Sequence, residues 1–121
     1  EKNTQLETIR KRRSQYTPIR PPIDPAGRIV IVIDDGLATG ATMISALHSL
    51  RARNPAKLIC AVPVAPPDTL KKVQSMADEV VCLLSPDYFM AVGQFYMDFA
   101  QVEDDEVIEV LRHSAAAPAA E

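Results

Sequence analysis

The chain has 121 residues, of which 47% are hydrophobic and 24% are charged, and its formal net charge is −3. This composition is typical of one globular domain with its own core, and it leaves no basic surplus for binding nucleic acid. The sequence contains no apolar run long enough to cross a bilayer and no signal-peptide pattern. We therefore expect a cytoplasmic protein without a membrane partner. Cys60 and Cys82 lie in apolar runs, where we expect reduced thiols rather than a disulfide or a metal site.

Residues 1–27 form a basic, Pro-rich arm. Residues 4–13 are compatible with a short helix, which the prolines from Pro18 onward prevent from continuing. The sequence Asp-Pro-Ala-Gly at residues 24–27 predicts a turn that leads into the first strand. The arm is therefore expected to be separate from the body of the domain.

Strand and helix patterns alternate through residues 28–113. Strands are predicted at residues 28–34, 57–64 and 79–84, and helices at residues 40–53, 66–77 and 103–112. A β-α-β-α-β order with right-handed crossovers predicts a three-layer α/β fold with a mainly parallel sheet, followed by a C-terminal helix. Residues 114–121 are expected to form a flexible tail.

Residues 30–42, VIVIDDGLATGAT, combine a strand, two acids and a loop of small residues. The apolar, β-branched run is typical of a strand buried on both faces of a parallel sheet. Asp34 and Asp35 follow it directly, and ligands of open α/β sheets bind beyond the carboxyl ends of the strands. The loop can direct backbone N–H groups at an anion, and the next helix adds the positive end of its dipole. This arrangement suits a sugar phosphate.

Other interpretations of these residues exist. Asp34 and Asp35 could be a metal-binding pair or a solvated strand end, and receiver domains of two-component signalling also carry an acidic pair at a strand end. Receiver domains need a phosphoacceptor aspartate at the end of a later strand, where this chain has the apolar residues 61–64. Thr39 and Thr42 have a structural alternative as helix caps, which is compatible with donating to an anion.

The segment 30–42 resembles the signature of the type I phosphoribosyltransferases, which use 5-phosphoribosyl-1-pyrophosphate (PRPP) with Mg²⁺. The resemblance implies that Asp34 and Asp35 bind the ribose hydroxyls and contact the metal indirectly, through Mg–PRPP. It further implies a loop around the 5′-phosphate, made of Ala38, Thr39, Gly40, Ala41 and Thr42. The strand and helix order would then be half of a phosphoribosyltransferase-type, Rossmann-like fold.

Two positions depart from or divide the family pattern. Gly36 stands where an aliphatic residue is usual. Ala38 stands where several purine-salvage members have an aspartate, proposed as the base for the nitrogen nucleophile, whereas adenine- and uracil-type members have alanine. The resemblance therefore implies no loop acid that deprotonates the substrate, and it leaves the catalytic residues unassigned.

Residues 88–99, YFMAVGQFYMDF, contain five of the six aromatic residues of the chain. Residues 91–99 loosely resemble the base-binding segment of purine-salvage phosphoribosyltransferases, with a spacing one residue longer. This resemblance implies that Phe95 or Tyr96 stacks on a nucleobase and that Asp98 lies near the base or Mg²⁺. The alternative is that these aromatic residues pack against the last helix.

Complete family members have further strands and a pyrophosphate loop before the signature strand, where this chain has only 27 residues and no apolar run. We therefore interpret the chain as the C-terminal portion of a longer phosphoribosyltransferase, inactive as an isolated fragment. The arm of residues 1–27 is a candidate remnant of the mobile catalytic loop. Because the truncated sheet exposes an edge, we expect a homo-oligomer.

Three functions follow as hypotheses. The first is transfer of a 5-phosphoribosyl group from PRPP to a nitrogenous base, with release of pyrophosphate. The second is a non-catalytic regulatory domain of the same fold that binds PRPP or a nucleotide. The third is a fragment that only pairs with another chain. Turnover of PRPP with a base separates the first from the others.

Overall fold

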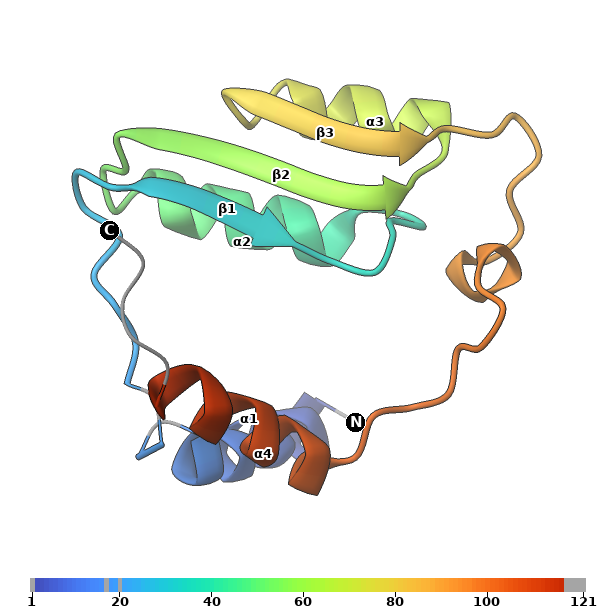
Figure 1. The fold of residues 1–121 in the computed structure, drawn as a ribbon. Coiled ribbons are helices and arrows are strands. Elements are labelled where there is room, and N and C mark those ends of the chain that lie inside the picture. The colour runs from blue at the N-terminus through green and yellow to red at the C-terminus, as the bar shows by residue number, and fades with distance from the viewer. Residues whose placement is uncertain (1, 17, 20, 117–121) are drawn as a thin grey trace. The chain divides into compact units, whose positions relative to one another are not determined.

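The computed structural model describes residues 2–16, 18–19 and 21–116, which belong to two compact units. A helical unit lies within residues 1–23 and 100–121 and contains α1 (Lys2–Tyr16) and α4 (Asp104–Ala116). A sheet unit spans residues 24–99 (Figure 1). Its elements are β1 (Ile29–Ile33), α2 (Ala41–Arg51), β2 (Lys57–Val64), α3 (Pro67–Gln74), β3 (Glu79–Leu84) and the 3₁₀ helix η1 (Val92–Phe95).

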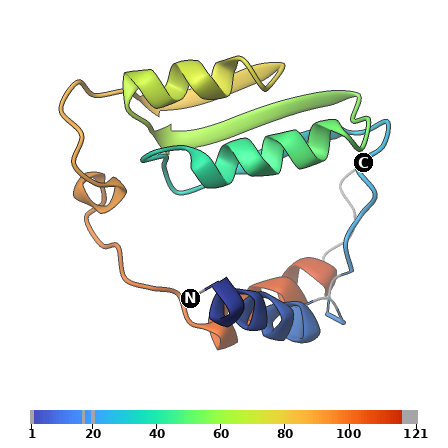
Figure 2. The same ribbon diagram turned by 180° about the vertical axis from the view of Figure 1, so that it is seen from behind.

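The sheet has the strand order β1-β2-β3, and both neighbouring pairs are parallel. The predicted α/β fold, its three parallel strands and the C-terminal helix are thus confirmed. Helices α2 and α3 lie on the same face of the sheet, as the front and back views show (Figures 1 and 2). Right-handed crossovers that progress in one direction place successive helices on one face, which explains this arrangement.

The core of the sheet unit lies between the two helices and the central strand. Leu47 of α2, Val73 of α3, and Leu58 and Cys60 of β2 are fully buried there. Burial raises the pKa of the Cys60 thiol, because the charged thiolate is poorly solvated in the core. Cys60 and Cys82 are both free, and Cys82 is only partly buried. Among the described strands, β2 is the one that supplies buried side chains to this core.

The opposite face of the sheet carries exposed apolar side chains. Ile29, Ile31 and Ile33 of β1 are 66%, 54% and 76% exposed, and Leu83 of β3 is 81% exposed. A hollow of about 250 Å³ on this face is lined by Ile33, Val81, Leu83 and residues 61–63 of β2. The sequence predicts three layers and burial of β1 on both faces, but the sheet unit by itself has two layers. The reason is that both of its crossover helices cover the same face.

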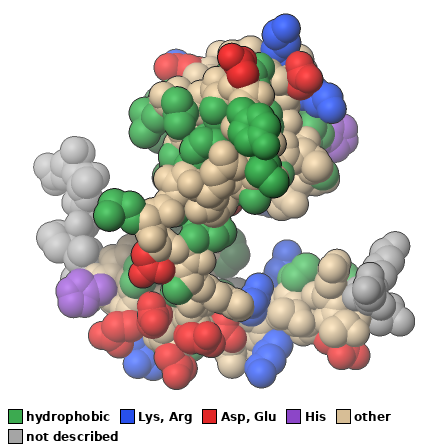
Figure 3. All heavy atoms as spheres, turned by 90° about the vertical axis from the view of Figure 1, so that its right-hand side faces the viewer, with side chains coloured by type: hydrophobic (Ala, Val, Ile, Leu, Met, Phe, Trp, Pro, Cys, Tyr) green, Lys and Arg blue, Asp and Glu red, His purple; other side chains and the backbone are tan. Residues whose placement is uncertain are grey.

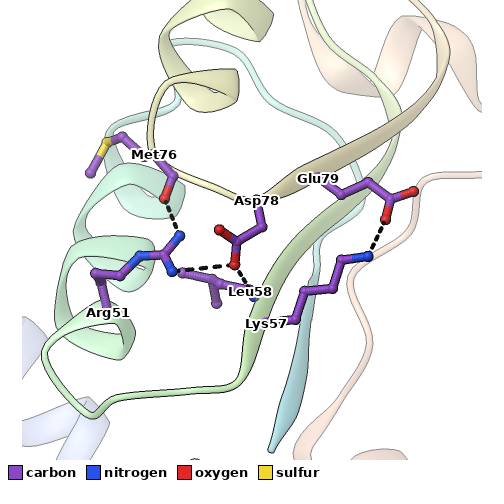
Figure 4. Close-up of polar contacts among 6 residues, drawn as sticks. All are labelled: Arg51, Lys57, Leu58, Met76, Asp78 and Glu79. Carbon is purple, nitrogen blue, oxygen red and sulfur yellow. Dashed lines mark hydrogen bonds and ion pairs between the residues drawn. The ribbon is translucent and has the colours of Figure 1, made fainter.

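A polar cluster connects the amino ends of β2 and β3. Asp78 accepts hydrogen bonds from the Leu58 N–H at 2.7 Å and from the Arg51 guanidinium at 3.2 Å, and Arg51 also donates to the Met76 carbonyl (Figure 4). These donors lower the pKa of Asp78, the Leu58 N–H most of all. Beside them, Lys57 pairs with Glu79 at 3.1 Å. The cluster links β2 and β3 at their amino ends, opposite to the carboxyl ends of the strands.

In the helical unit, α1 packs against α4. The Tyr16 hydroxyl donates a hydrogen bond to Asp104 at 2.6 Å, and Arg12 lies 3.7 Å from the same carboxylate. The predicted arm thus contains a helix longer than residues 4–13, while its residues 17 and 20 lie outside the described residues. Helix α4 includes residues 114–116 of the predicted tail, and residues 117–121 lie outside the described residues. Among the described helices, none is long and apolar enough to cross a membrane.

Candidate functional site

The loop between β1 and α2 forms a pocket at the carboxyl ends of the strands. Asp34 and Asp35 follow the last residue of β1, and α2 begins at Ala41. The pocket has a volume of about 160 Å³ and is lined by Asp34 and residues 36–43. The structure thus brings Asp34 together with the predicted phosphate-loop residues Ala38, Thr39, Gly40, Ala41 and Thr42 in one concave surface.

The two adjacent carboxylates differ in environment. Asp34 is half-buried and accepts a hydrogen bond from the Asp35 backbone N–H at 2.8 Å, whereas Asp35 is exposed. Loss of solvation raises the pKa of Asp35, and the neighbouring Asp34 charge raises it further. The two carboxylates repel each other when both are charged. A hydroxyl-rich ligand or a cation bound between them would compensate this repulsion.

The pocket loop is attached to the sheet and to α3. The Leu37 N–H donates to the Val64 carbonyl at 2.9 Å, and the Leu37 side chain is buried. The Thr69 hydroxyl of α3 donates to the Ala38 carbonyl at 2.7 Å, and Thr69 is only 6% exposed. These bonds fix the loop while the small side chain of Ala38 leaves its backbone accessible to a ligand.

Gly40 gives the loop its final turn before α2. Its φ angle is +79°, in the left-handed region that disfavours residues with a Cβ. A Cβ at this position would lie 2.8 Å from Cγ2 of Thr69. Helix α2 starts immediately afterwards, with the Ile44 N–H donating to the Gly40 carbonyl at 2.8 Å. Gly40 is therefore required both by its backbone angle and by the close approach of α3.

The two threonines lie around the start of α2, Thr39 before the helix and Thr42 within it. The Thr39 hydroxyl accepts a hydrogen bond from the Ala41 N–H at 3.3 Å. The N-cap residue of α2 is Gly40, and no side chain caps the helix there, so the alternative that Thr39 or Thr42 is the helix cap is wrong. Thr42 is exposed in the first turn of α2. Because the first N–H groups of a helix have no intrahelical partner, they remain available to an anion.

The aromatic segment meets the site through Tyr96. The Tyr96 hydroxyl donates a hydrogen bond to the backbone carbonyl of Asp35, and its ring lies 5.0 Å from that of Phe99 between centroids. Phe95 packs against Phe89 with 5.3 Å between centroids, and Asp98 is exposed. Of the three predicted base-side residues, Tyr96 thus forms a hydrogen bond to the backbone of the acid pair. On the side of the sheet unit where the strands end, hydrophobic side chains gather at the surface (Figure 3).

Two contacts of the site have no signal in the sequence. Thr69 occupies the first turn of α3, a position where threonine is usually exposed, yet it is buried against the loop. Val92 of η1 packs against Gly36, where an added Cβ would lie 2.7 Å from Val92 Cγ1. Both contacts join residues more than twenty positions apart, so no local pattern could predict them.

Comparison with known proteins identifies relatives of this site. A family model described as the phosphoribosyl transferase domain matches residues 1–100. A Mycobacterium tuberculosis (strain H37Rv) protein named "Putative phosphoribosyl transferase" is 43% identical over 107 residues, which are 88% of this chain and 24% of that protein. The uracil phosphoribosyltransferase of Acinetobacter baylyi is 40% identical over 68 residues, which are 56% of this chain and 31% of that protein.

A solved structure shares the fold. The crystal structure of TT1426 from Thermus thermophilus matches with a TM-score of 0.84 and 40% sequence identity. The match covers 92% of this chain and 53% of that chain. The chain thus spans about half of TT1426 and about a quarter of the mycobacterial relative.

Proposed function

Because the chain belongs to the phosphoribosyl transferase domain family, we propose that it contains the PRPP-binding part of a phosphoribosyltransferase. The reaction would transfer a 5-phosphoribosyl group from PRPP to a nitrogenous base and release pyrophosphate. The observation that carries the proposal is the pocket at the strand ends, where an acidic side chain and a loop of small residues share one surface. A ligand with hydroxyls at one end and a phosphate at the other matches this pattern.

In this proposal the acids and the loop hold opposite ends of the sugar phosphate. Asp34 and Asp35 accept hydrogen bonds from the ribose hydroxyls, since ionised carboxylates are strong acceptors. The backbone N–H groups of residues 38–42 donate to the 5′-phosphate, and the dipole of α2 adds about 0.3–1 kcal/mol. The ribose becomes oxocarbenium-like in the transition state, as pyrophosphate departs. Catalysis would therefore rest on positioning of the substrates and stabilisation of this charge.

Asp34 and Asp35 also fit an indirect role toward Mg²⁺. Mg²⁺ in proteins usually combines one or two carboxylates with phosphates of the substrate. Among the described residues, no group of three His, Cys, Asp or Glu side chains is placed to hold a metal ion. A cation carried by PRPP and approached by the acid pair is consistent with this donor set. When bound, it would neutralise charge on the pyrophosphate leaving group.

The acceptor base is selected by groups outside this acid pair. Ala38 supplies no acid to deprotonate the base, so a base that is nucleophilic without loop assistance is favoured. The relative named uracil phosphoribosyltransferase supports including uracil among the candidates. The same alanine is compatible with the second hypothesis, a regulatory domain that binds PRPP or a nucleotide without turnover.

Binding can be tested with the chain itself. In an NMR titration with inorganic phosphate, we expect the amide signals of residues 38–42 to shift at millimolar concentrations, because several charged hydrogen bonds, each about 1.5–3 kcal/mol, converge on one anion. Amides of α4 serve as the internal reference. Equal shifts in the loop and in α4 would refute the phosphate-binding assignment.

Turnover needs a separate experiment. We expect the 121-residue chain to form no nucleotide from PRPP, Mg²⁺ and a panel of purine and pyrimidine bases, and a longer polypeptide of the length of TT1426 to form it with one of them. Turnover by the isolated chain would contradict its interpretation as an incomplete enzyme. PRPP binding by the longer protein without turnover of any base would favour the regulatory alternative.

A further inference from the structure

The environment of Tyr96 differs from that of a residue whose ring stacks on a nucleobase. Its hydroxyl donates to the backbone carbonyl of Asp35, and its ring lies against Phe99. We infer that Tyr96 is a positioning residue for the acid pair, acting through the Asp35 backbone and not through contact with the base. This inference rests on the proposed function, because its consequence is a change in PRPP affinity.

A second contact attaches the same segment to the same strand end. Val92 of η1 packs on Gly36, the residue after Asp35, where an added Cβ would lie 2.7 Å from Val92 Cγ1 and 2.9 Å from Val64 Cγ1. Gly36 is buried. The aromatic segment is thus held on two consecutive residues of the site loop, by a hydrogen bond at one and by packing at the other.

The segment has enough internal structure to act as a support. The Gln94 side-chain oxygen accepts hydrogen bonds from the Met90 N–H at 3.0 Å and the Ala91 N–H at 3.4 Å. The Tyr96 N–H donates to the Gly93 carbonyl at 3.2 Å. These bonds fold residues 90–96 on themselves, so the Tyr96 hydroxyl is presented to Asp35 from a structured element.

The position of Asp35 needs such a support. In the described sheet β1 is an edge strand, paired on one side with β2 alone. The pairing extends past β1 to a long Asp34 N–H to Ala61 carbonyl bond of 3.4 Å, and resumes at Leu37. Between these two bonds, the Asp35 carbonyl is held by Tyr96. Because the Asp35 carboxylate is attached to this backbone, the hydroxyl of Tyr96 influences where the carboxylate meets the ribose.

The test removes the hydroxyl and keeps the ring. Tyr96→Phe is compared with Tyr88→Phe, a matched control because Tyr88 is 75% exposed and its hydroxyl makes a weak 3.7 Å contact with Met90 Sδ. The full chain is titrated with PRPP in the presence of Mg²⁺ and observed by NMR. We expect Tyr96→Phe to weaken PRPP binding about three- to tenfold, the effect of one neutral hydrogen bond. It should also shift the amide signals of residues 35 and 36 before PRPP is added, and Tyr88→Phe should do neither.

The outcomes separate the inference from the proposed function. If the unmodified chain binds PRPP and Tyr96→Phe binds it equally well, the positioning role is refuted while the proposed function stands. The positioning role is also refuted if Tyr96→Phe weakens PRPP binding without shifting the amide signals of residues 35 and 36, since Tyr96 would then act elsewhere. If the unmodified chain does not bind PRPP, the proposed function fails and the positioning role fails with it. If Tyr96 only stacked on the base, Tyr96→Phe would leave PRPP binding and the amide signals of residues 35 and 36 unchanged, because the ring remains.

Discussion

Replacing Gly40 by alanine should destabilise the sheet unit through two separable effects. The first is the left-handed backbone, φ +79°, which costs a residue with a Cβ about 1–2 kcal/mol. The second is overlap of the new Cβ with Thr69 Cγ2, at 2.8 Å. Overpacking of this kind typically costs about 1–3 kcal/mol, so the two effects together should lower the free energy of unfolding by about 2–5 kcal/mol.

The overlap is not easily relieved, because Thr69 is held in place. It is 6% exposed, and its hydroxyl donates to the Ala38 carbonyl at 2.7 Å. Thr69→Ser removes the methyl group and keeps the hydroxyl. In the Thr69→Ser background the overlap is absent, so Gly40→Ala should cost only the backbone part. The two substitutions should therefore couple favourably by about 1–3 kcal/mol, the cost of the overlap.

Gly27 offers a matched control for the backbone effect alone. Its φ angle is +70°, and an added Cβ would meet no atom within 4 Å. Gly27→Ala should thus cost about 1–2 kcal/mol in any background. Urea denaturation followed by NMR signals of the sheet unit measures all four variants, provided that the m-value is unchanged. The reasoning is refuted if Gly40→Ala costs no more than Gly27→Ala, or if Thr69→Ser leaves the cost of Gly40→Ala unchanged.

Three further outcomes are expected. Asp34→Asn should lower the raised pKa of Asp35 toward its usual range, because the substitution removes the Asp34 charge that helps to raise it. A pH titration of the carboxyl groups by NMR measures this pKa, and an equal value in both proteins would contradict the expectation. The lowered pKa of Asp78 stabilises the fold above about pH 4, the usual aspartate range, and this contribution is lost as the pH falls through the folded-state value. Urea midpoints should therefore fall more steeply below about pH 4 for the unmodified chain than for Asp78→Asn, and equal losses would exclude the effect. Leu83 is 81% exposed on the open sheet face, so Leu83→Glu should weaken self-association in sedimentation experiments. If the unmodified chain is a monomer at all concentrations, the expected homo-oligomer is wrong.

The order of elements and the place of the site follow from local patterns in the sequence. Alternating strand and helix periodicity predicted three parallel strands, because side-chain periods of about 2 and 3.6 residues are encoded in short segments. The acid pair and the small-residue loop were recognisable because they too form a short, continuous segment. Asp34, Gly40 and their neighbours are consecutive in the chain, so the β1–α2 connection that holds them is itself a local structure. The ends of the helices were less accurate: α3 ends at Gln74 and not at residue 77, and α4 ends at Ala116 and not at residue 112.

Contacts between distant segments were decided only by the tertiary structure. The sequence did not indicate that α1 pairs with α4 through Tyr16 and Asp104, which are 88 positions apart. It predicted burial of β1 on both faces, whereas Ile31 is exposed, because β-branched runs look alike whether one face or two are covered. Thr69 and Tyr96 reach the site loop from 31 and 61 positions away. A local pattern records which residues share a helix face or a strand, but the neighbours of a side chain across elements depend on how those elements pack, and packing is a property of the folded chain alone.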